Sequence, residues 1–98
     1  DNNTIPDVFA LHNNYPNPFN PITNIRYDIP EVSDVKIDIY NLAGKKVKTL
    51  VSSNHQPGRY KIQWNATNES GAPVSTGMYI YKIRAKDFVS VKKLLLMK

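Results

Sequence analysis

The sequence predicts an all-β protein, a sandwich of two antiparallel sheets with about seven short strands. Three observations support this fold class. Apolar and polar residues alternate with a period of two along most of the chain after residue 21. Proline, glycine and asparagine interrupt the alternation at short intervals. No segment shows the 3.6-residue apolar period of an amphipathic helix.

The predicted strands follow one another with turn residues between them. Pro30 ends the first regular strand, because proline cannot donate to a central ladder. Gly44 suits the positive φ of the turn after the second strand. Asn65 to Thr76 forms a polar connection later in the chain. We expect strands over residues 23–29, 35–40, 47–51, 60–64, 79–85 and 88–97, and a short edge strand over residues 8–11.

The last predicted strand is less regular than the others. Val89 and Val91 share one parity along it, whereas Leu94 and Leu96 share the other. A β-bulge near residues 92–93 would explain this change of parity. Partial cover of both faces of the strand is the alternative.

Large aromatic residues at inward positions are expected to anchor the core. Trp64 has this parity in one strand, and Tyr79 and Tyr81 have it in another. Tyr79 opens its strand two residues after Gly77, a placement that suits the tyrosine corner of immunoglobulin-like sandwiches. We therefore expect an immunoglobulin-like antiparallel β-sandwich. The cysteine pair of antibody domains is absent, so the analogy concerns architecture alone.

The 98 residues are expected to form one domain with a distinct start. Residues 1–21 form a leader rich in proline and asparagine, and residues 22–98 form the sandwich. Pro16 and Pro18 exclude helix around them. We expect Tyr15 and Phe19 to pin the leader onto the sandwich, because a segment without a buried anchor would stay mobile. Asn17 belongs to the same proline-rich motif.

Charge is unevenly distributed along the chain. Residues 1–44 hold two basic and six acidic residues, and residues 45–98 hold eleven basic and two acidic. We interpret the basic half as solvated strand faces, with an anionic partner as the alternative. No apolar run approaches the roughly 18 residues of a membrane span. The chain begins without methionine, so we expect a piece of a longer protein whose export signal lies upstream.

A search for catalytic or metal-binding patterns finds none that is convincing. His12 and His55 fall in predicted loops far apart in sequence, with no carboxylate at ligand spacing. Asp28 and Asp38 have outward parity, where a charge is simply solvated. The oxygen-rich segment 65–71 contains a single carboxylate, so a turn is favoured over a calcium site. We expect no enzyme activity, no cofactor and no metal.

Exposed aromatic rings offer a different kind of site. Tyr15, Phe19 and Tyr40 fall outside the inferred core parity and are candidates for a carbohydrate-binding platform. We favour the anchoring role for the first two of these rings. Fully burying each ring would contribute about 2–3 kcal/mol before ordering costs.

Four segments carry a resemblance to a known family. In chain order they resemble the motifs of type A carboxyl-terminal sorting domains of the type IX secretion system, and they are Leu11–Pro21, Ile39–Val47, Gly77–Ile83 and Lys92–Lys98. The stretch from Gly58 through Trp64 to Tyr81 also resembles the immunoglobulin-like domain of the flagellar hook-capping protein. That pattern often has aspartate after the tryptophan, where this chain has Asn65.

The resemblance implies a non-catalytic sorting domain that ends a larger secreted or surface-attached bacterial protein. It implies that an outer-membrane translocon recognises the domain and that a sortase-like peptidase often removes it from its upstream cargo. The residues carried over for recognition are Gly77, Tyr79, Lys92, Lys93, Leu94, Leu95, Leu96, Met97 and Lys98. Independently, a strand-like end with leucines and lysines offers unpaired backbone for β-augmentation by a receptor.

Two other functions remain open at this point. One is a carbohydrate-binding module that accompanies a catalytic domain. The other is a structural spacer or assembly module. Exposed edge strands also leave room for a homodimer, and we expect no nucleic-acid partner.

Overall fold

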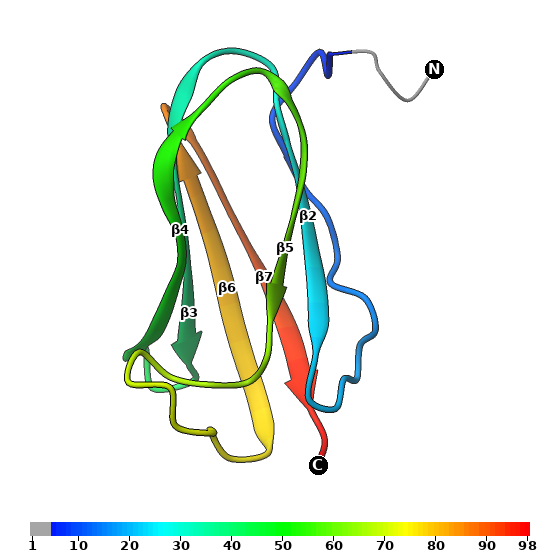
Figure 1. The fold of residues 1–98 in the computed structure, drawn as a ribbon, viewed down its shortest axis with the longest axis vertical. Coiled ribbons are helices and arrows are strands. Elements are labelled where there is room, and N and C mark those ends of the chain that lie inside the picture. Colours follow the sequence, from blue (N-terminus) through cyan, green and yellow to red (C-terminus); the bar gives the residue numbers. More distant parts are fainter. Residues whose placement is uncertain (1–4) are drawn as a thin grey trace.

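The computed structural model describes residues 5–98, which fold into two antiparallel sheets without a helix among them (Figure 1). None of these residues belongs to a helix long and apolar enough to cross a membrane. The strands are β1 (Ala10–Leu11), β2 (Thr23–Ile29), β3 (Ser33–Asn41), β4 (Lys46–His55), β5 (Gly58–Trp64), β6 (Gly77–Ala85) and β7 (Phe88–Leu96).

The strands form one three-stranded and one four-stranded sheet. The smaller sheet has the order β1-β2-β5, and the larger has the order β4-β3-β6-β7. The chain crosses between the sheets three times: after β2, where Pro30 stands, after β4, at residues 56–57, and along residues 65–76 after β5. The all-β sandwich predicted from the sequence is therefore confirmed, with its seven antiparallel strands.

Alternate residues of both sheets fill the space between them. β2 contributes Ile25 and Ile29, β3 contributes Ile37, and β6 contributes Ile83, all with no exposed surface. Trp64 and the two predicted tyrosines, Tyr79 and Tyr81, are also buried, which confirms their role in the core. Each fully buried aliphatic side chain contributes about 1.5–3 kcal/mol relative to an exposed one.

β7 runs without a β-bulge, which was one of the two explanations for its irregular parity. Its register with β6 is unbroken from Gly77 opposite Leu96 to Ala85 opposite Phe88. The inward parity instead includes Lys92, which is half-buried because a lysine stem can cover apolar surface while its charge stays in water. The irregularities in register lie between β3 and β4. The polar Lys92 at an inward position thus made a regular strand look irregular in the sequence.

The leader runs beside the end of β7 rather than apart from the sandwich. Leu11 and Phe19 are buried in the core, and β1 pairs with β2 through Ala10 and Leu11. Tyr15 is 79% exposed, so the prediction that its ring anchors the leader is wrong. Phe19 is the buried aromatic anchor, and Phe9 adds a half-buried ring stacked on Phe88 at 5.4 Å. The 2% exposure of Phe19 also excludes it from a carbohydrate platform.

Candidate recognition surface at the carboxyl-terminal end

The four motif segments meet at one end of the molecule, the lower end in Figure 1. The second segment pairs with the third, since Asn41 lies opposite Tyr79. The third pairs with the last, since Tyr79 also lies opposite Leu94. The first reaches the last through a parallel bridge between Phe19 and Leu96. Segments that are far apart in sequence therefore build a single surface.

Backbone hydrogen bonds fasten the leader to the end of β7. The N–H of Phe19 donates to the carbonyl of Leu95, and the N–H of Met97 donates to the carbonyl of Phe19, both at 3.0 Å. The side-chain oxygen of Asn17 accepts from the N–H of Leu95 at 3.0 Å. The prediction of an unpaired terminal backbone is therefore wrong for Leu95 and Met97. Within residues 5–98, Val89, Val91 and Lys93 have no backbone hydrogen bond outside the β6–β7 pair.

An aromatic cluster supports this end from within. The Trp64 ring lies 5.6 Å from that of Phe19 and 5.4 Å from that of Tyr79. The indole N–H of Trp64 donates to the carbonyl of Thr67 at 2.9 Å. The hydroxyl of Tyr79 donates to the carbonyl of Ser75 at 2.6 Å, which is the hydrogen bond of a tyrosine corner. The predicted corner is confirmed.

Two glycines shape turns at the same end. Gly44 has a φ of +85° in the β3–β4 turn, as predicted. Gly77 has a φ of +149°, which side chains rarely adopt, and it begins β6 opposite Leu96. Gly77 and the 6% exposed Tyr79 therefore hold the shape of this end rather than offering side chains to a partner.

Exposure divides the terminal segment into two sets. Leu94 and Leu96 are fully buried and belong to the core. Met97 is 52% exposed, and Lys93 and Lys98 are exposed beside it. Met78 lies opposite the half-buried Leu95 on the neighbouring strand. We call the accessible set the terminal surface, and its members are Met78, Lys93, Leu95, Met97 and Lys98.

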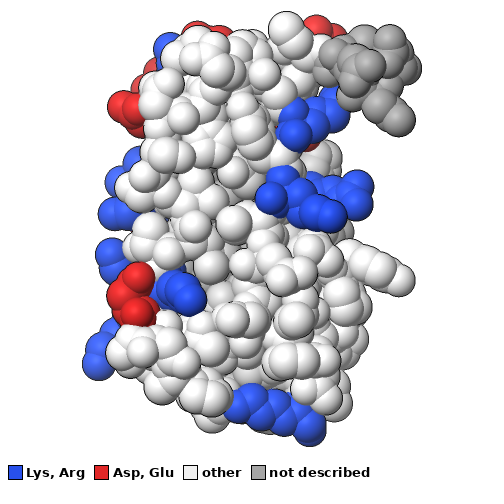
Figure 2. Space-filling model, in the orientation of Figure 1, with Lys and Arg blue, Asp and Glu red and all other residues white. Residues whose placement is uncertain are grey.

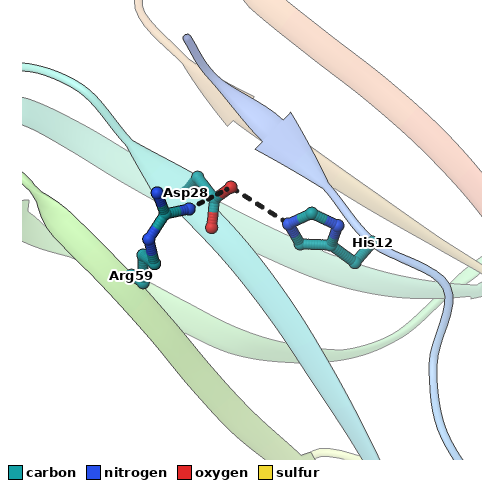
Figure 3. Close-up of polar contacts among 3 residues, drawn as sticks. All are labelled: His12, Asp28 and Arg59. Carbon is teal, nitrogen blue, oxygen red and sulfur yellow. Dashed lines mark hydrogen bonds and ion pairs between the residues drawn. The ribbon is translucent and has the colours of Figure 1, made fainter. Parts of the chain in front are cut away.

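Asp28 is buried rather than solvated as its outward parity predicted. Its exposure is 8%, and Figure 3 shows His12 and Arg59 converging on it from two other segments. The His12 Nε2–H and the Arg59 Nη1–H donate to the same carboxylate oxygen, at 3.1 and 3.2 Å. Long side chains from neighbouring strands cover this face of the sheet, which parity alone does not reveal. The cluster ties the leader to β2 and β5.

Asp38 is likewise buried, at 8% exposure, on the outer face of the larger sheet. The Thr49 hydroxyl donates to it at 2.6 Å and the Tyr40 hydroxyl at 3.4 Å. Partial burial and the Asp38 charge raise the pKa of Tyr40. Neutral hydroxyl donors therefore satisfy much of this carboxylate.

His55 ends β4 instead of lying in a loop, and it packs in an aromatic group. Its ring lies 4.6 Å from that of Tyr60, and its Nε2 is hydrogen-bonded to the Tyr27 hydroxyl at 2.8 Å. Burial, with a smaller effect of Tyr60, raises the pKa of Tyr27 to about 12. Sequence spacing missed this group because its members come from three strands.

Within residues 5–98, no group of three histidine, cysteine or acidic residues is placed to hold a metal ion. In the segment predicted as a turn, the Asn68 side-chain oxygen accepts from the N–H groups of Ser70 and Ala72 at 3.1 and 3.0 Å. Its polar group thus closes a loop, as turn asparagines do.

Two sheets packed around Trp64, with a tyrosine corner at Tyr79, define an Ig-like domain. The chain belongs to the family of FlgD Ig-like domains, whose profile matches residues 22–87. A search of curated proteins finds no significant match. Small Ig-like domains are typically non-catalytic.

Two solved structures share the fold. Dimeric latent PorU from Porphyromonas gingivalis aligns with a TM-score of 0.71 and 19% identity, over 91% of this chain and 9% of PorU. PorZ of the same organism, described as an essential surface component of its type IX secretion system, aligns with a TM-score of 0.60 and 16% identity. That alignment covers 94% of this chain and 12% of PorZ. The chain therefore spans only a small part of either protein.

Proposed function

We propose that this chain is a non-catalytic sorting domain of a larger secreted or surface-attached bacterial protein, recognised by the type IX secretion machinery. The observation that carries the proposal is the convergence of all four motif segments on one end of the fold. At that end, a parallel β-bridge between Phe19 and Leu96 joins the first motif segment to the last. The terminal surface, built from β6 and the end of β7 and fastened by the leader, forms only after folding, so it can report that the module is folded.

The structural neighbours support the same reading. PorZ is described as a surface component of the type IX system. This chain aligns over most of its length with a small part of PorZ and of PorU, as expected for a module carried inside longer proteins. An outer-membrane translocon, a sortase-like peptidase and an upstream cargo domain are the partners that the proposal requires.

Recognition would proceed through side chains of the terminal surface. The backbone of Leu95 and Met97 is occupied by the leader, so a receptor strand cannot add there without displacing it. Met97 and Lys98 present an apolar group and a charge next to each other. Apolar anchors beside charged groups are typical of specific interfaces, because burial gives affinity and charge gives orientation.

A fusion of residues 1–98 to a periplasmic reporter tests the proposal in a type IX-competent bacterium. The reporter is expected on the cell surface, and the unfused reporter in the periplasm. Deleting residues 92–98 is a poor test, because it removes the buried Leu94 and Leu96 and would unfold the sandwich. Retention of the folded fusion in the periplasm would count against the proposal.

Membership of the FlgD Ig-like family favours a second candidate, a structural module in an extracellular assembly. Such a module would need no recognition by the secretion machinery. The position of the domain in the full-length gene separates the two functions. A stop codon after Lys98 supports sorting, whereas continued sequence supports a spacer or assembly role.

A further inference from the structure

Four basic residues of the second half of the chain, together with Lys36, lie around hollows on the outer face of the four-stranded sheet. Two hollows lie there, of about 290 and 520 Å3. Lys36 and Arg84 line both, so the hollows adjoin. In Figure 2, blue side chains line the β4 side of the molecule. The remaining cations around the hollows are Lys46, Lys82 and Lys86.

Lys86 is paired with Glu31 at 3.1 Å, but two of the other cations are placed unfavourably unless an anion joins them. Lys36 lies directly opposite Arg84 in the β3–β6 register, and like charges in that position destabilise a sheet. Lys46, Lys82 and Arg84 have no carboxylate within 4.0 Å among residues 5–98. A face with unneutralised charge of one sign attracts ligands of the other sign.

Two carboxylates lie at the hollows and neutralise these cations only in part: Asp34 lines the larger hollow, and Asp38 lies opposite Lys82 in the β3–β6 register. Asp38 accepts from the Thr49 hydroxyl at 2.6 Å, and its closest cation, Lys36, is 4.0 Å away. The opposite face of the sandwich also carries an opposed pair of cations, but its other cations are neutralised. There Arg59 and His12 are both bound to Asp28, which leaves Arg26 and Lys61 as an opposed pair.

We propose that the two hollows bind two consecutive sugar units of an anionic polysaccharide, each unit carrying a carboxylate group. Lys36 and Arg84, shared by both hollows, would bridge neighbouring carboxylate groups. Asp38 retains lone pairs for a sugar hydroxyl. The single ring present, Tyr40, is half-buried with its hydroxyl on Asp38. It therefore makes a poor stacking platform for nucleic-acid bases. The residues that line both hollows are mainly polar or charged, so this face lacks the large apolar side chains with which a membrane anchor inserts.

Two matched double variants of the 98-residue chain test this site. K36Q/R84Q removes one lysine and one arginine that lie opposite each other on the proposed site. R26Q/K61Q removes the equivalent opposed pair from the other sheet. Thermal melts establish that both variants are folded. Affinity electrophoresis through polygalacturonate then compares their retardation with that of the parent chain, and neutral dextran serves as the uncharged control.

We expect the parent chain and R26Q/K61Q to be retarded by polygalacturonate but not by dextran. K36Q/R84Q is expected to bind at least about tenfold more weakly, as the loss of charged hydrogen bonds implies. Equal weakening of the two variants would show that net charge alone governs binding and would overturn the proposal. So would absence of retardation, or tighter binding to single-stranded DNA or to vesicles containing phosphatidylglycerol. Loss of export in the reporter fusion would leave the proposal unaffected, since no residue of the terminal surface lines the two hollows.

Discussion

The side chain of Asn17 accepts a hydrogen bond at 3.0 Å from the backbone N–H of Leu95, 78 residues further along the chain. This contact closes the start of the domain onto its end. It also occupies a donor that would otherwise be available at the edge of β7. The terminal surface is therefore part of a completed sandwich rather than a free tail.

Replacing Asn17 by alanine tests that closure. The substitution removes the acceptor of the Leu95 N–H, so the free energy of unfolding should fall by about 0.5–1.5 kcal/mol. Asn13→Ala is the matched control, because Asn13 is exposed and makes no side-chain hydrogen bond within residues 5–98. Urea denaturation measures both. Equal stability of the two variants would show that the contact contributes nothing.

Phe19 and Tyr15 should differ sharply as anchors of the leader. Phe19→Ala leaves a cavity beside Trp64 and should cost about 3–5 kcal/mol. Tyr15→Ala should change stability by less than about 0.5 kcal/mol, because its ring lies mostly in water. Thermal and urea unfolding give both values. A costly Tyr15→Ala would contradict the placement of the leader.

The tyrosine corner is expected to stabilise the crossing between the sheets. Tyr79→Phe removes the donor to the Ser75 carbonyl and should lower the free energy of unfolding by about 0.5–1.5 kcal/mol. Tyr40→Phe should cost less, because its hydrogen bond to Asp38 is long and near the surface. The comparison uses equilibrium denaturation at neutral pH, and the reverse order of the two costs would argue against the corner.

Two buried tyrosines predict how stability changes in alkali. Burial raises the pKa of Tyr81, and burial aided by Tyr60 that of Tyr27, in each case to about 12, against about 10 in the unfolded chain. Both rings are neutral in both states below about pH 10. Between about pH 10 and 12 the unfolded chain alone loses these protons, so stability falls. The slope should reach about 1.4 kcal/mol per pH unit for each ring. Tyr81→Phe should flatten this fall; an unchanged pH profile would refute the assignment.

The alternation of apolar and polar residues predicted the strands and the core. It failed to predict burial where side chains from other segments cover a residue on the outer face of a sheet. Alternation places Ile37 and Ile83 inward whatever surrounds them. It also places Asp28 outward, but it does not show that His12 and Arg59 reach across to bury it. The same reasoning applies to Lys92. Its polar side chain at an inward position interrupted the apolar alternation, and a β-bulge was one explanation for that interruption.

The candidate surface was predictable only in part. The terminal residues were identified from motifs and composition, and their division into buried and exposed sets needed the packing of β7. The leader's contacts could not be predicted, because hydrogen bonds between Phe19 and residues 95–97 join the two ends of the chain. Periodicity carries no information about such long-range pairs.

Surface display of a reporter fused to residues 1–98 tests the central claim most directly when the variants stay folded. Met97→Asp/Lys98→Glu changes the terminal surface and leaves its backbone hydrogen bonds in place. Val8→Asp/Lys61→Glu makes the same two kinds of change at exposed positions elsewhere. We predict that the parent and the second variant reach the cell surface, whereas the first, folded by its thermal melt, stays in the periplasm. Display of the first variant at the parental level would contradict recognition through this surface.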